Sequence, residues 1–524
     1  MTTVDAVVIG AGHNGLVAAN LLADAGWRVL VLEAEPEPGG AVRSAEITAP
    51  GFVSDLCSAF YPLGAVSPVL ARLDLESHGL EWRHAPSVLA HVLPDDRCVV
   101  LHRDEDETAA SLAEFHPADA DAWHAECARW RQLSPALLGA LFSPFPPVRD
   151  GLRLARRLGV ADGLRFARFG VQPLRRYAEE RFHGAGARAL VAGNALHTDL
   201  APESAGSAIF GWLLAMLGQH AGFPVPAGGA GMLTRALADR FVTRGGQLDC
   251  GRAASRVLVA RGRALGVRDQ AGEAIRARRA VIADVSAPAL FTELVDPEQL
   301  PPRFRADLRD FQWDSDVVKV DWALRSPVPW TAKPARLAGT VHLGGDLDGL
   351  TGYATELVLG NLPRRLFTLL GQMTTTDPSR SPAGTESLWA YTHVPRGRAW
   401  TVKSAGRYAD RIEELIERHA PGFRDLVQAR AVAAPGVGGH GEVVVNGGTA
   451  GLAQQLVFRP VPGLGRADTP VDRLYLASAS AHPGGGVHGG PGANAATAAL
   501  ARSGMFGDVY AAGIRAAHRS IYRD

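Results

Sequence analysis

The first 33 residues alternate between apolar runs and a helical pattern. Residues 6–9 are apolar, residues 16–24 carry apolar side chains at helical spacing, and residues 28–32 form a second apolar run that ends at Glu33. Short apolar runs bounded by glycine are typical of buried parallel strands. The pattern therefore predicts a strand–helix–strand unit at the start of a parallel-sheet domain.

The turn between the first strand and the helix has the sequence GAGHNG, residues 10–15. Gly10 permits a tight turn, Gly12 lets the backbone approach a pyrophosphate, and Gly15 lets the helix pack closely on the strand. Glu33 lies 23 positions after Gly10, near the spacing of roughly 20 expected for an acid that binds ribose hydroxyls. The motif predicts a dinucleotide site, and the acid disfavours the 2′-phosphate of NADP.

The N-terminus of this helix offers unpaired N–H groups and the positive end of the helix dipole to phosphates. We therefore expect His13 and Asn14, in the first helical turn, and Ala34, directly after Glu33, to contact the dinucleotide as well. A strand–helix–strand unit without a ligand is the alternative interpretation of this segment.

Two later segments carry further strand and turn patterns. Residues 226–231 form a loop that leads into a predicted helix over 232–243, and short β-patterned runs follow up to residue 284. Near the C-terminus, a predicted strand over 474–477 enters a glycine-rich loop. Pro491 then opens an alanine-rich helix, which is a favourable position for proline.

Composition narrows the class of protein. The 524 residues are 47% hydrophobic and 21% charged, with 54 basic and 54 acidic side chains. Such a chain fits a globular protein of two or three domains and gives no reason to expect nucleic-acid binding. Its four cysteines are scattered without a CxxC pair, so we expect neither a metal site nor a disulfide. The start of the chain lacks the features of a signal peptide, and we expect a cytoplasmic protein.

The segment DSDVVKVDWAL, residues 314–324, predicts a strand because it is rich in β-branched and aromatic side chains. Lys319 is one of only three lysines in the chain, and strand alternation places it on one face with Val317 and Asp321. On this pattern alone, Lys319 either faces water on a half-exposed strand or serves a function for which arginine is unsuitable.

Three motifs in order resemble the glutathione-reductase-type FAD superfamily, in its amine oxidase and phytoene desaturase (phytoene dehydrogenase-like) branch. They are the GAGHNG turn with Glu33, the following PEPGGAVRSAEI with Gly39, Gly40 and Arg43, and HPGGGVHGGPG near the C-terminus. The resemblance implies FAD as the cofactor, with Gly39 and Gly40 beside its pyrophosphate. The common family form is GGRxxS, and here the arginine stands two places later, at Arg43.

The same resemblance implies contacts with the adenine, with the phosphate chain and with the flavin ring. The residues are, in that order, Ala254; Ala479 and Ser480; and Val487, His488 and Gly489. The dipole of the helix that begins after Gly489 would stabilise negative charge on the flavin.

For catalysis, the resemblance implies that Lys319 holds a water against N5 of the flavin, where an ammonium assists hydride or proton movement. His482 and His488 lie inside the flavin-facing motif and are candidates for proton transfer. A packing or capping role is the alternative for both histidines, and the half-exposed strand remains the alternative for Lys319.

The resemblance spans the whole chain and implies an α/β fold. A discontinuous Rossmann-like FAD domain takes residues 1–75, 220–292 and 465–524, and an inserted α+β substrate domain takes 76–219 and 293–464. The implied function is an FAD-dependent dehydrogenase or desaturase that takes hydride from an apolar polyene, isoprenoid or lipid-like substrate. An FAD-dependent amine oxidase is one alternative, and a prenyl-binding protein without flavin, like the Rab-GDP-dissociation-inhibitor group, is another.

Residues 149–181 contain nine arginines and four acids, interleaved with leucine and phenylalanine. A basic amphipathic helix of this kind either binds an anionic membrane surface or presents a solvated face. The longest apolar run, residues 208–218, is shorter than the about 20 residues that span a bilayer, so it predicts a buried helix or a segment that dips into a membrane surface. A peripheral membrane contact and a homodimer both stay open, beside an apolar small-molecule substrate.

Overall fold

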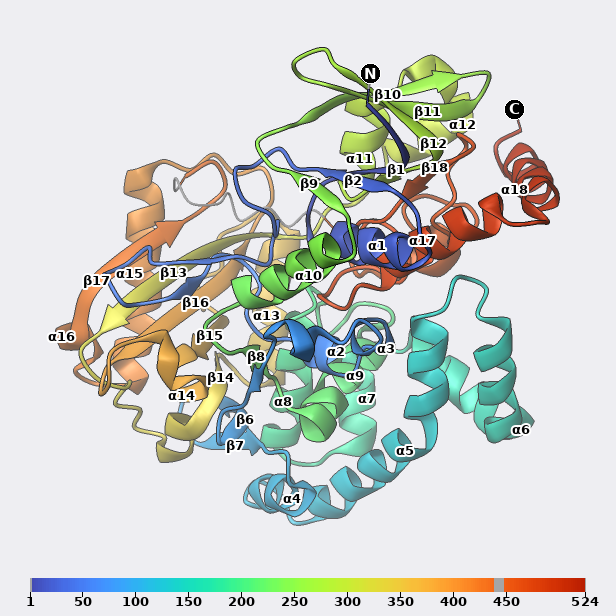
Figure 1. Ribbon diagram of the computed structural model, residues 1–524. Coiled ribbons are helices and arrows are strands. Elements are labelled where there is room, and N and C mark those ends of the chain that lie inside the picture. Colours follow the sequence, from blue (N-terminus) through green and yellow to red (C-terminus); the bar gives the residue numbers. More distant parts are fainter. Residues whose placement is uncertain (1, 438–446, 524) are drawn as a thin grey trace.

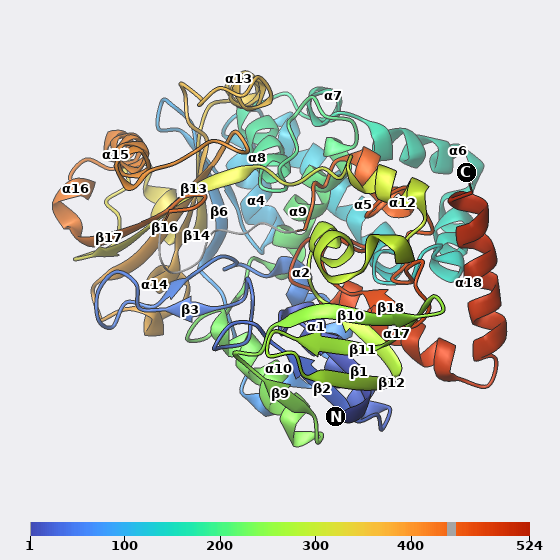
Figure 2. The same cartoon turned by 90° about the horizontal axis from the view of Figure 1, so that it is seen from above.

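Two seven-stranded β-sheets organise the described parts of the chain, residues 2–437 and 447–523 of a computed structural model. In Figure 1 the first sheet lies at the top, the second lies to the left, and a layer of helices fills the lower right. The two sheets also lie apart when seen from above in Figure 2. The expected α/β class is confirmed, and each sheet forms the centre of its own region.

The first sheet contains the predicted strand–helix–strand unit. Its strands are β1 (Thr3–Ile9), β2 (Val29–Leu32), β9 (Gln247–Asp249), β10 (Ala254–Ala260), β11 (Arg263–Asp269), β12 (Ala274–Ala283) and β18 (Leu474–Leu476). β1 pairs in parallel with β2 and β12, β2 with β9, and β12 with β18, while β10 and β11 form an antiparallel extension. Segments far apart in the sequence thus meet in one parallel sheet.

Three helices cover one face of this sheet: α1 (His13–Asp24), α10 (Gly231–Thr243) and α17 (Gly490–Ser503). Their apolar side chains and those of β1, β2 and β12 form one buried core. The helices α1 and α17 pack against each other, so the N-terminal and C-terminal motifs come together.

The second sheet is mainly antiparallel, with one parallel pair between β6 and β14. Its strands, in spatial order, are β17 (Val427–Ala433), β13 (Asp316–Leu324), β16 (Glu386–Val394), β15 (Thr368–Gln372), β14 (Ala338–Leu343), β6 (Ser87–Val92) and β7 (Cys98–Leu101). The helix α15 (Val402–His419) packs its apolar face on one side of this sheet. Val320 and Trp322 face α15, so Lys319 and Asp321 face the opposite side, as the alternation predicts.

A helical layer packs on that opposite side of the second sheet. Its helices are α4 (Glu105–Ala113), α5 (Ala118–Leu141), α6 (Val148–Val171), α7 (Leu174–Arg181), α8 (Ala185–Leu196) and α9 (Ser207–Ala221). α9 contains the apolar run 208–218 and is largely buried against α8, so this run forms a buried helix. None of the helices in the described residues is both long and apolar enough to cross a membrane.

The remaining elements are short or peripheral. They are β3 (Ser44–Ala45), β4 (Ser54–Asp55), β5 (Trp82–Arg83), β8 (Val225–Pro226), α2 (Pro62–Ala65), α3 (Pro68–Ala71), α11 (Ala287–Ala289), α12 (Pro302–Leu308), α13 (Leu347–Val358), α14 (Met373–Thr376), α16 (Phe423–Leu426) and α18 (Gly507–Ile521).

Candidate active site

The GAGHNG turn packs directly against Asp284, the residue that follows β12. A Cβ atom on Gly10 would stand 2.7 Å from the Asp284 carbonyl oxygen, and one on Gly12 would stand 2.6 Å from Asp284 Oδ2. Gly10 also has a φ of +90°, so this position needs glycine. The Gly15 N–H donates to Asp284 Oδ2 at 2.7 Å, and burial raises the pKa of this carboxyl to about 7. Sequence reasoning missed Asp284, because nothing local links it to the turn.

The first turn of α1 is built for an anion. It contains no acidic side chain, and among the described residues the buried His13 Nε2 and Asn14 Oδ1 have no hydrogen-bond partner. Free N–H groups at a helix N-terminus bind phosphate, and unpartnered buried polar atoms are typical of a site that takes a ligand.

Glu33 is buried, with 8% of its surface exposed. Its carboxylate accepts hydrogen bonds from the Ala11 N–H at 2.6 Å and the Glu35 N–H at 3.0 Å. Ionised carboxylates have about four acceptor sites, so Glu33 has capacity left for two ribose hydroxyls. Ala34, the next residue, is exposed. Ala254 lies at the start of β10. Two residues before it, the Arg252 N–H donates to the Glu33 carbonyl, so this strand begins close to Glu33.

The second glycine pair lies against the first turn. Gly39 forms a β-bridge with Gly12, and a Cβ on Gly40 would stand 3.4 Å from Gly12 Cα. Arg43 Nε donates to the Gly40 carbonyl at 3.0 Å. The arginine that stands two places later than in the family pattern therefore still lies at the glycine pair.

The C-terminal glycine-rich loop contains six of the predicted residues, five of them predicted to contact the cofactor. Ala479 and Ser480 follow β18, and the Ser480 hydroxyl accepts from the Ala287 N–H at 3.1 Å. Val487 and His488 line a cavity, and Gly489 is the residue before α17. Arg459, which the sequence did not single out, is buried and donates to the Ala479 carbonyl from Nε at 3.0 Å and from Nη2 at 2.7 Å.

The two candidate histidines have different surroundings. His488 Nδ1 accepts from the Gly490 N–H at 3.0 Å, and burial lowers the pKa of its ring to about 3, so His488 caps the start of α17 as a neutral ring. His482 contacts the Phe145 ring at 5.9 Å between centroids. Among the described residues that line the cavity, His488 is present and His482 is not.

Lys319 is buried at 3% exposure, which excludes the half-exposed strand. Its Nζ donates to both carboxylate oxygens of Asp321, at 2.6 and 2.5 Å, and to the Asp55 carbonyl at 3.0 Å. Burial raises the pKa of the Asp321 carboxyl. Asp55 in turn pairs with Arg380 at 2.8 Å, and both side chains are fully buried. The lysine therefore belongs to a buried network of two acids and two bases.

One cavity of about 410 Å³ is lined by two of the three predicted catalytic residues, Lys319 and His488. It lies where the second sheet, the helical layer and the C-terminal loop meet, and it contains both apolar and polar side chains. Its apolar lining includes Phe60, Leu63, Leu141, Phe210, Leu213, Leu214, Leu217, Phe223 and Val487, and its polar lining includes Cys57, His197, Asp199, Asp314, Lys319, Tyr391, His393 and His488. Tyr391 pairs with Lys319 across β13 and β16; only this register reveals it as a site residue.

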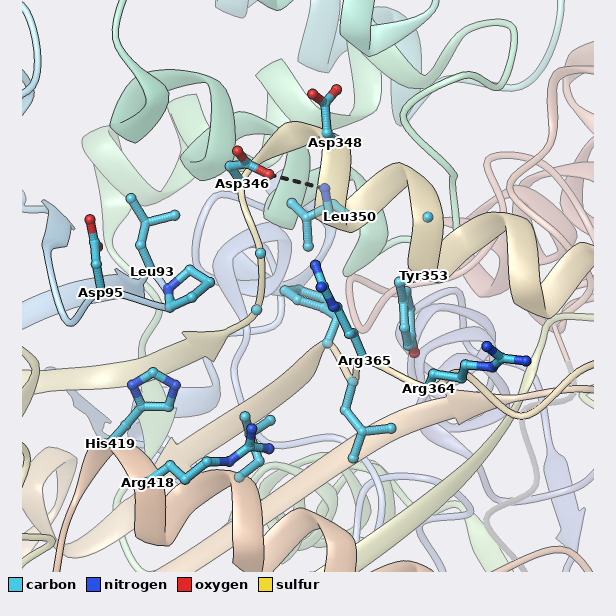
Figure 3. A pocket seen from close by; sticks show the side chains of 18 of the residues that line it. Leu93, Asp95, Asp346, Asp348, Leu350, Tyr353, Arg364, Arg365, Arg418 and His419 are labelled. Atoms are coloured by element: carbon cyan, nitrogen blue, oxygen red, sulfur yellow. Dashed lines mark hydrogen bonds between the residues drawn. The ribbon is translucent and has the colours of Figure 1, made fainter.

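A second, larger pocket of about 1170 Å³ lies between α13, α15 and the loop that follows β6. Figure 3 shows its charged lining, with Asp346 and Asp348 on one side and Arg364, Arg365 and Arg418 on the other. Of the predicted site residues, Lys319, Val487 and His488 line the smaller cavity, so we place the chemistry there. Within residues 2–437 and 447–523, no group of His, Cys, Asp or Glu side chains could hold a metal ion.

The residues present fit FAD. The glycine turn, the open first turn of α1, the buried Glu33 and the neighbouring Gly39–Gly40 pair form a continuous cradle for an adenosine and a pyrophosphate. The start of α17 adds a second helix N-terminus near the cavity.

Comparison with known proteins supports this interpretation. The family of flavin-containing amine oxidoreductases matches residues 15–500. Pyridine nucleotide-disulfide oxidoreductase domain-containing protein 2 of Mus musculus is 28% identical over 535 residues, covering 91% of this chain and 89% of that protein. Prolycopene isomerase 1 of an Oncidium hybrid is 28% identical over 313 residues, covering 57% and 51%.

Among solved structures, a triple mutant of putrescine oxidase superposes with a TM-score of 0.61 at 18% identity, covering 96% of this chain and 99% of the oxidase. This likeness confirms the expected fold, an FAD domain with an inserted substrate domain. Because the family match extends over nearly the whole chain and the described residues form an FAD cradle beside a cavity, the chain belongs to the flavin-containing amine oxidoreductase family and is an FAD-dependent oxidoreductase.

Proposed function

We propose that the protein is a dehydrogenase or desaturase that acts on an apolar, isoprenoid- or lipid-like substrate. The observation that carries this proposal is the cavity lining, in which leucine and phenylalanine side chains of α9 and the loop before α2 surround Lys319 and His488. Burial of apolar surface is the main source of affinity in such a cavity. The similarity to a prolycopene isomerase, whose name denotes a polyene substrate, supports the same class.

FAD, when bound, accepts a hydride; the chain's own residues bind and orient the substrate. The apolar side chains exclude water, and the network around Lys319 holds the ammonium at a fixed place in the lining. We assign to Lys319 the positioning of a water or a substrate atom near the flavin, because its compact ammonium is held in the cavity lining by Asp321 and the Asp55 carbonyl.

Amine oxidation is the second candidate. It is favoured by the carboxylates of Asp199 and Asp314 in the same cavity, since these would attract an alkylammonium group. A flavin-free prenyl-binding protein is the third candidate and is disfavoured by the intact FAD cradle.

The discriminating experiment uses the purified protein with its flavin. Fractions of a cell lipid extract and a panel of primary alkylamines are each incubated anaerobically with it, and loss of the oxidised flavin absorbance is recorded. We expect a lipid fraction to reduce the flavin, with mass spectrometry showing a product that has lost two hydrogens. Reduction by the amines alone would support amine oxidation, and a colourless protein that cannot bind added FAD would contradict both.

A matched pair of variants tests whether the substrate binds in the cavity. Phe210→Asp places a charge in the cavity, and Leu359→Asp places the same charge at an exposed site outside it. We expect Phe210→Asp to keep its FAD but to lose reduction by the lipid fraction, and Leu359→Asp to react like the wild type.

We also propose that α6 contacts an anionic membrane surface. Five apolar side chains of this helix are at least half exposed: Val148, Leu152, Val160, Leu164 and Val171. Six arginines lie between them, and Phe169 is the buried residue of the helix. α6 lies at the edge of the helical layer in both views (Figures 1 and 2) and packs against α9, which lines the cavity. The backbone of α6 is non-helical at Gly159, and apolar and basic side chains on the two segments that it joins suit a lipid headgroup region.

A further inference from the structure

A carboxylate and an imidazole form a tight pair in the lining of the cavity. Asp199 Oδ1 lies 2.5 Å from His393 Nε2, and the two side chains are 15% and 4% exposed. The Ser315 N–H donates to Asp199 Oδ2 at 3.1 Å. Asp199 follows α8, His393 belongs to β16, and both line the cavity with Lys319.

The backbone of Asp199 is strained. Its φ is +63°, in the left-handed region that residues other than glycine rarely adopt. Such strain persists where the surrounding structure enforces it and is concentrated at functional sites. Here it turns the carboxylate into the cavity lining.

The position of His393 is itself fixed by Tyr353. The hydroxyl of Tyr353 on α13 accepts from the His393 N–H at 2.9 Å and lies 3.4 Å from His393 Nδ1. Figure 3 shows Tyr353 where α13 borders the outer charged pocket. With Nδ1 facing this hydroxyl, the Nε2–H of His393 is the group that donates to Asp199.

The register of the second sheet places this pair next to Lys319. Lys319 stands opposite Tyr391, and Val317 stands opposite His393, so all four share two adjacent strands. Side chains two residues apart on a strand point to the same face. Tyr391 and His393 therefore face the cavity together.

We propose that Asp199 is the proton acceptor of the reaction and that His393 is its positioning residue. The proposal rests on the dehydrogenase function proposed above. Forming a double bond removes a hydride, with its electron pair, from one substrate atom and a proton from its neighbour. The hydride goes to FAD, the oxidant, with the electron pair of its own C–H bond. The proton goes to a carboxylate oxygen of Asp199, and the electron pair of the C–H bond that it leaves forms the new double bond.

Other titratable groups lie near Asp199, and proton uptake by these groups must be distinguished from proton uptake by Asp199. They are His197 on the same chain segment, Asp314 before β13, Lys319 on β13, Tyr391 and His393 on β16, and Tyr353 on α13. Burial, with the nearby Asp199, raises the pKa of Asp314 to about 6, and burial lowers the pKa of His197 to about 4. Asp314 is thus the competing proton site.

The test measures the reduction potential of the bound FAD against pH, from which the protons taken up per electron pair follow. Two-electron reduction adds negative charge beside the cavity, and a nearby carboxylate then binds a proton more readily. The variants are Asp199→Asn and Asp314→Asn. Asparagine tolerates the left-handed backbone of position 199, so the fold is kept.

We expect the wild type and Asp314→Asn to take up more protons per electron pair than Asp199→Asn, with a loss of up to about one proton in the latter. His393→Gln should shift the pH at which this uptake occurs and serves in place of Asp199→Asn if that variant loses its flavin. Equal uptake by Asp199→Asn and the wild type, or a loss confined to Asp314→Asn, would overturn the proposal while leaving the flavin function intact. Failure to bind FAD in the wild type would instead overturn the proposed function.

Discussion

Lys319 shows how a single residue combines structure with chemistry. Its ammonium is bound by Asp321 and by the Asp55 carbonyl inside the second sheet. Removing one partner of a buried ion pair leaves an uncompensated charge. Any change at this position therefore affects stability as well as the cavity.

We expect Lys319→Met to lower the free energy of unfolding by about 3–5 kcal/mol, because Asp321 would remain buried without its partner. The double variant Lys319→Met/Asp321→Asn removes both charges and should recover most of this loss. Chemical denaturation checks both values. In the double variant, flavin reduction should still be slowed at least about tenfold, or ~1.4 kcal/mol. A single variant as stable as the wild type would mean that the pair does not form.

A second prediction for a single residue concerns Glu33. Glu33→Gln removes the charge that strengthens hydrogen bonds to ribose hydroxyls, so the affinity for FAD should fall by about 1–3 kcal/mol. Titration of the flavin-free protein with FAD measures this loss. Glu35→Gln, at an exposed acid two residues away, is the matched control, and an equal loss in both variants would argue against a direct ribose contact.

At the scale of elements, the helix α6 stands out because its apolar side chains remain exposed next to arginines. Most surface helices bury one face against the core. A helix of this composition at the edge of the layer that lines the cavity is well placed to bring the cavity to a lipid surface.

The wild type should co-sediment with vesicles that contain phosphatidylglycerol and should be released by salt, since each arginine near an anionic surface contributes about 1 kcal/mol. Val160→Asp/Leu164→Asp should abolish binding. The control Val358→Asp/Val402→Asp changes two equally exposed valines elsewhere and should leave binding unchanged. Wild-type protein that stays in the supernatant at low salt would contradict the membrane contact.

For the molecule as a whole, buried histidines dominate the response to acid. Burial lowers the pKa of nine rings below their usual 6.5: His13, His84, His91, His102, His197, His342, His482, His488 and His518. Between about pH 6.5 and pH 4 the unfolded chain binds protons that the folded protein does not, so stability must fall as the pH falls. Asp284, Asp314 and Glu386 act in the opposite sense, because burial raises their pKa values to about 7, 6 and 7.

Since the histidines outnumber these acids, we expect the free energy of unfolding to decrease from pH 7 to pH 5. Urea denaturation at several pH values measures the slope. His342→Gln removes a fully buried ring and should make the slope shallower, whereas His220→Gln, at an exposed ring, should not. A slope unchanged by His342→Gln would show that this ring titrates alike in both states.

Local sequence patterns predict the fold class and most of the FAD cradle. The GAGHNG turn, Glu33 and the Gly39–Gly40 pair lie within 31 residues of one another, and their conformations follow from local backbone preferences and short spacing. A glycine turn between a strand and a helix has few ways to fold, so the motif predicts its own geometry.

The polar lining of the cavity, in contrast, depends on long-range packing. The alternation along residues 316–324 is compatible with either an exposed or a buried Lys319. Lys319 is buried because the helical layer packs on its face of the sheet and excludes water from it. Asp55 lies 264 positions from Lys319, and Asp199 meets His393 through the register of β13 and β16 and the end of α8. Contacts of this kind depend on long-range strand pairing and on the closure of long loops, which no local pattern encodes.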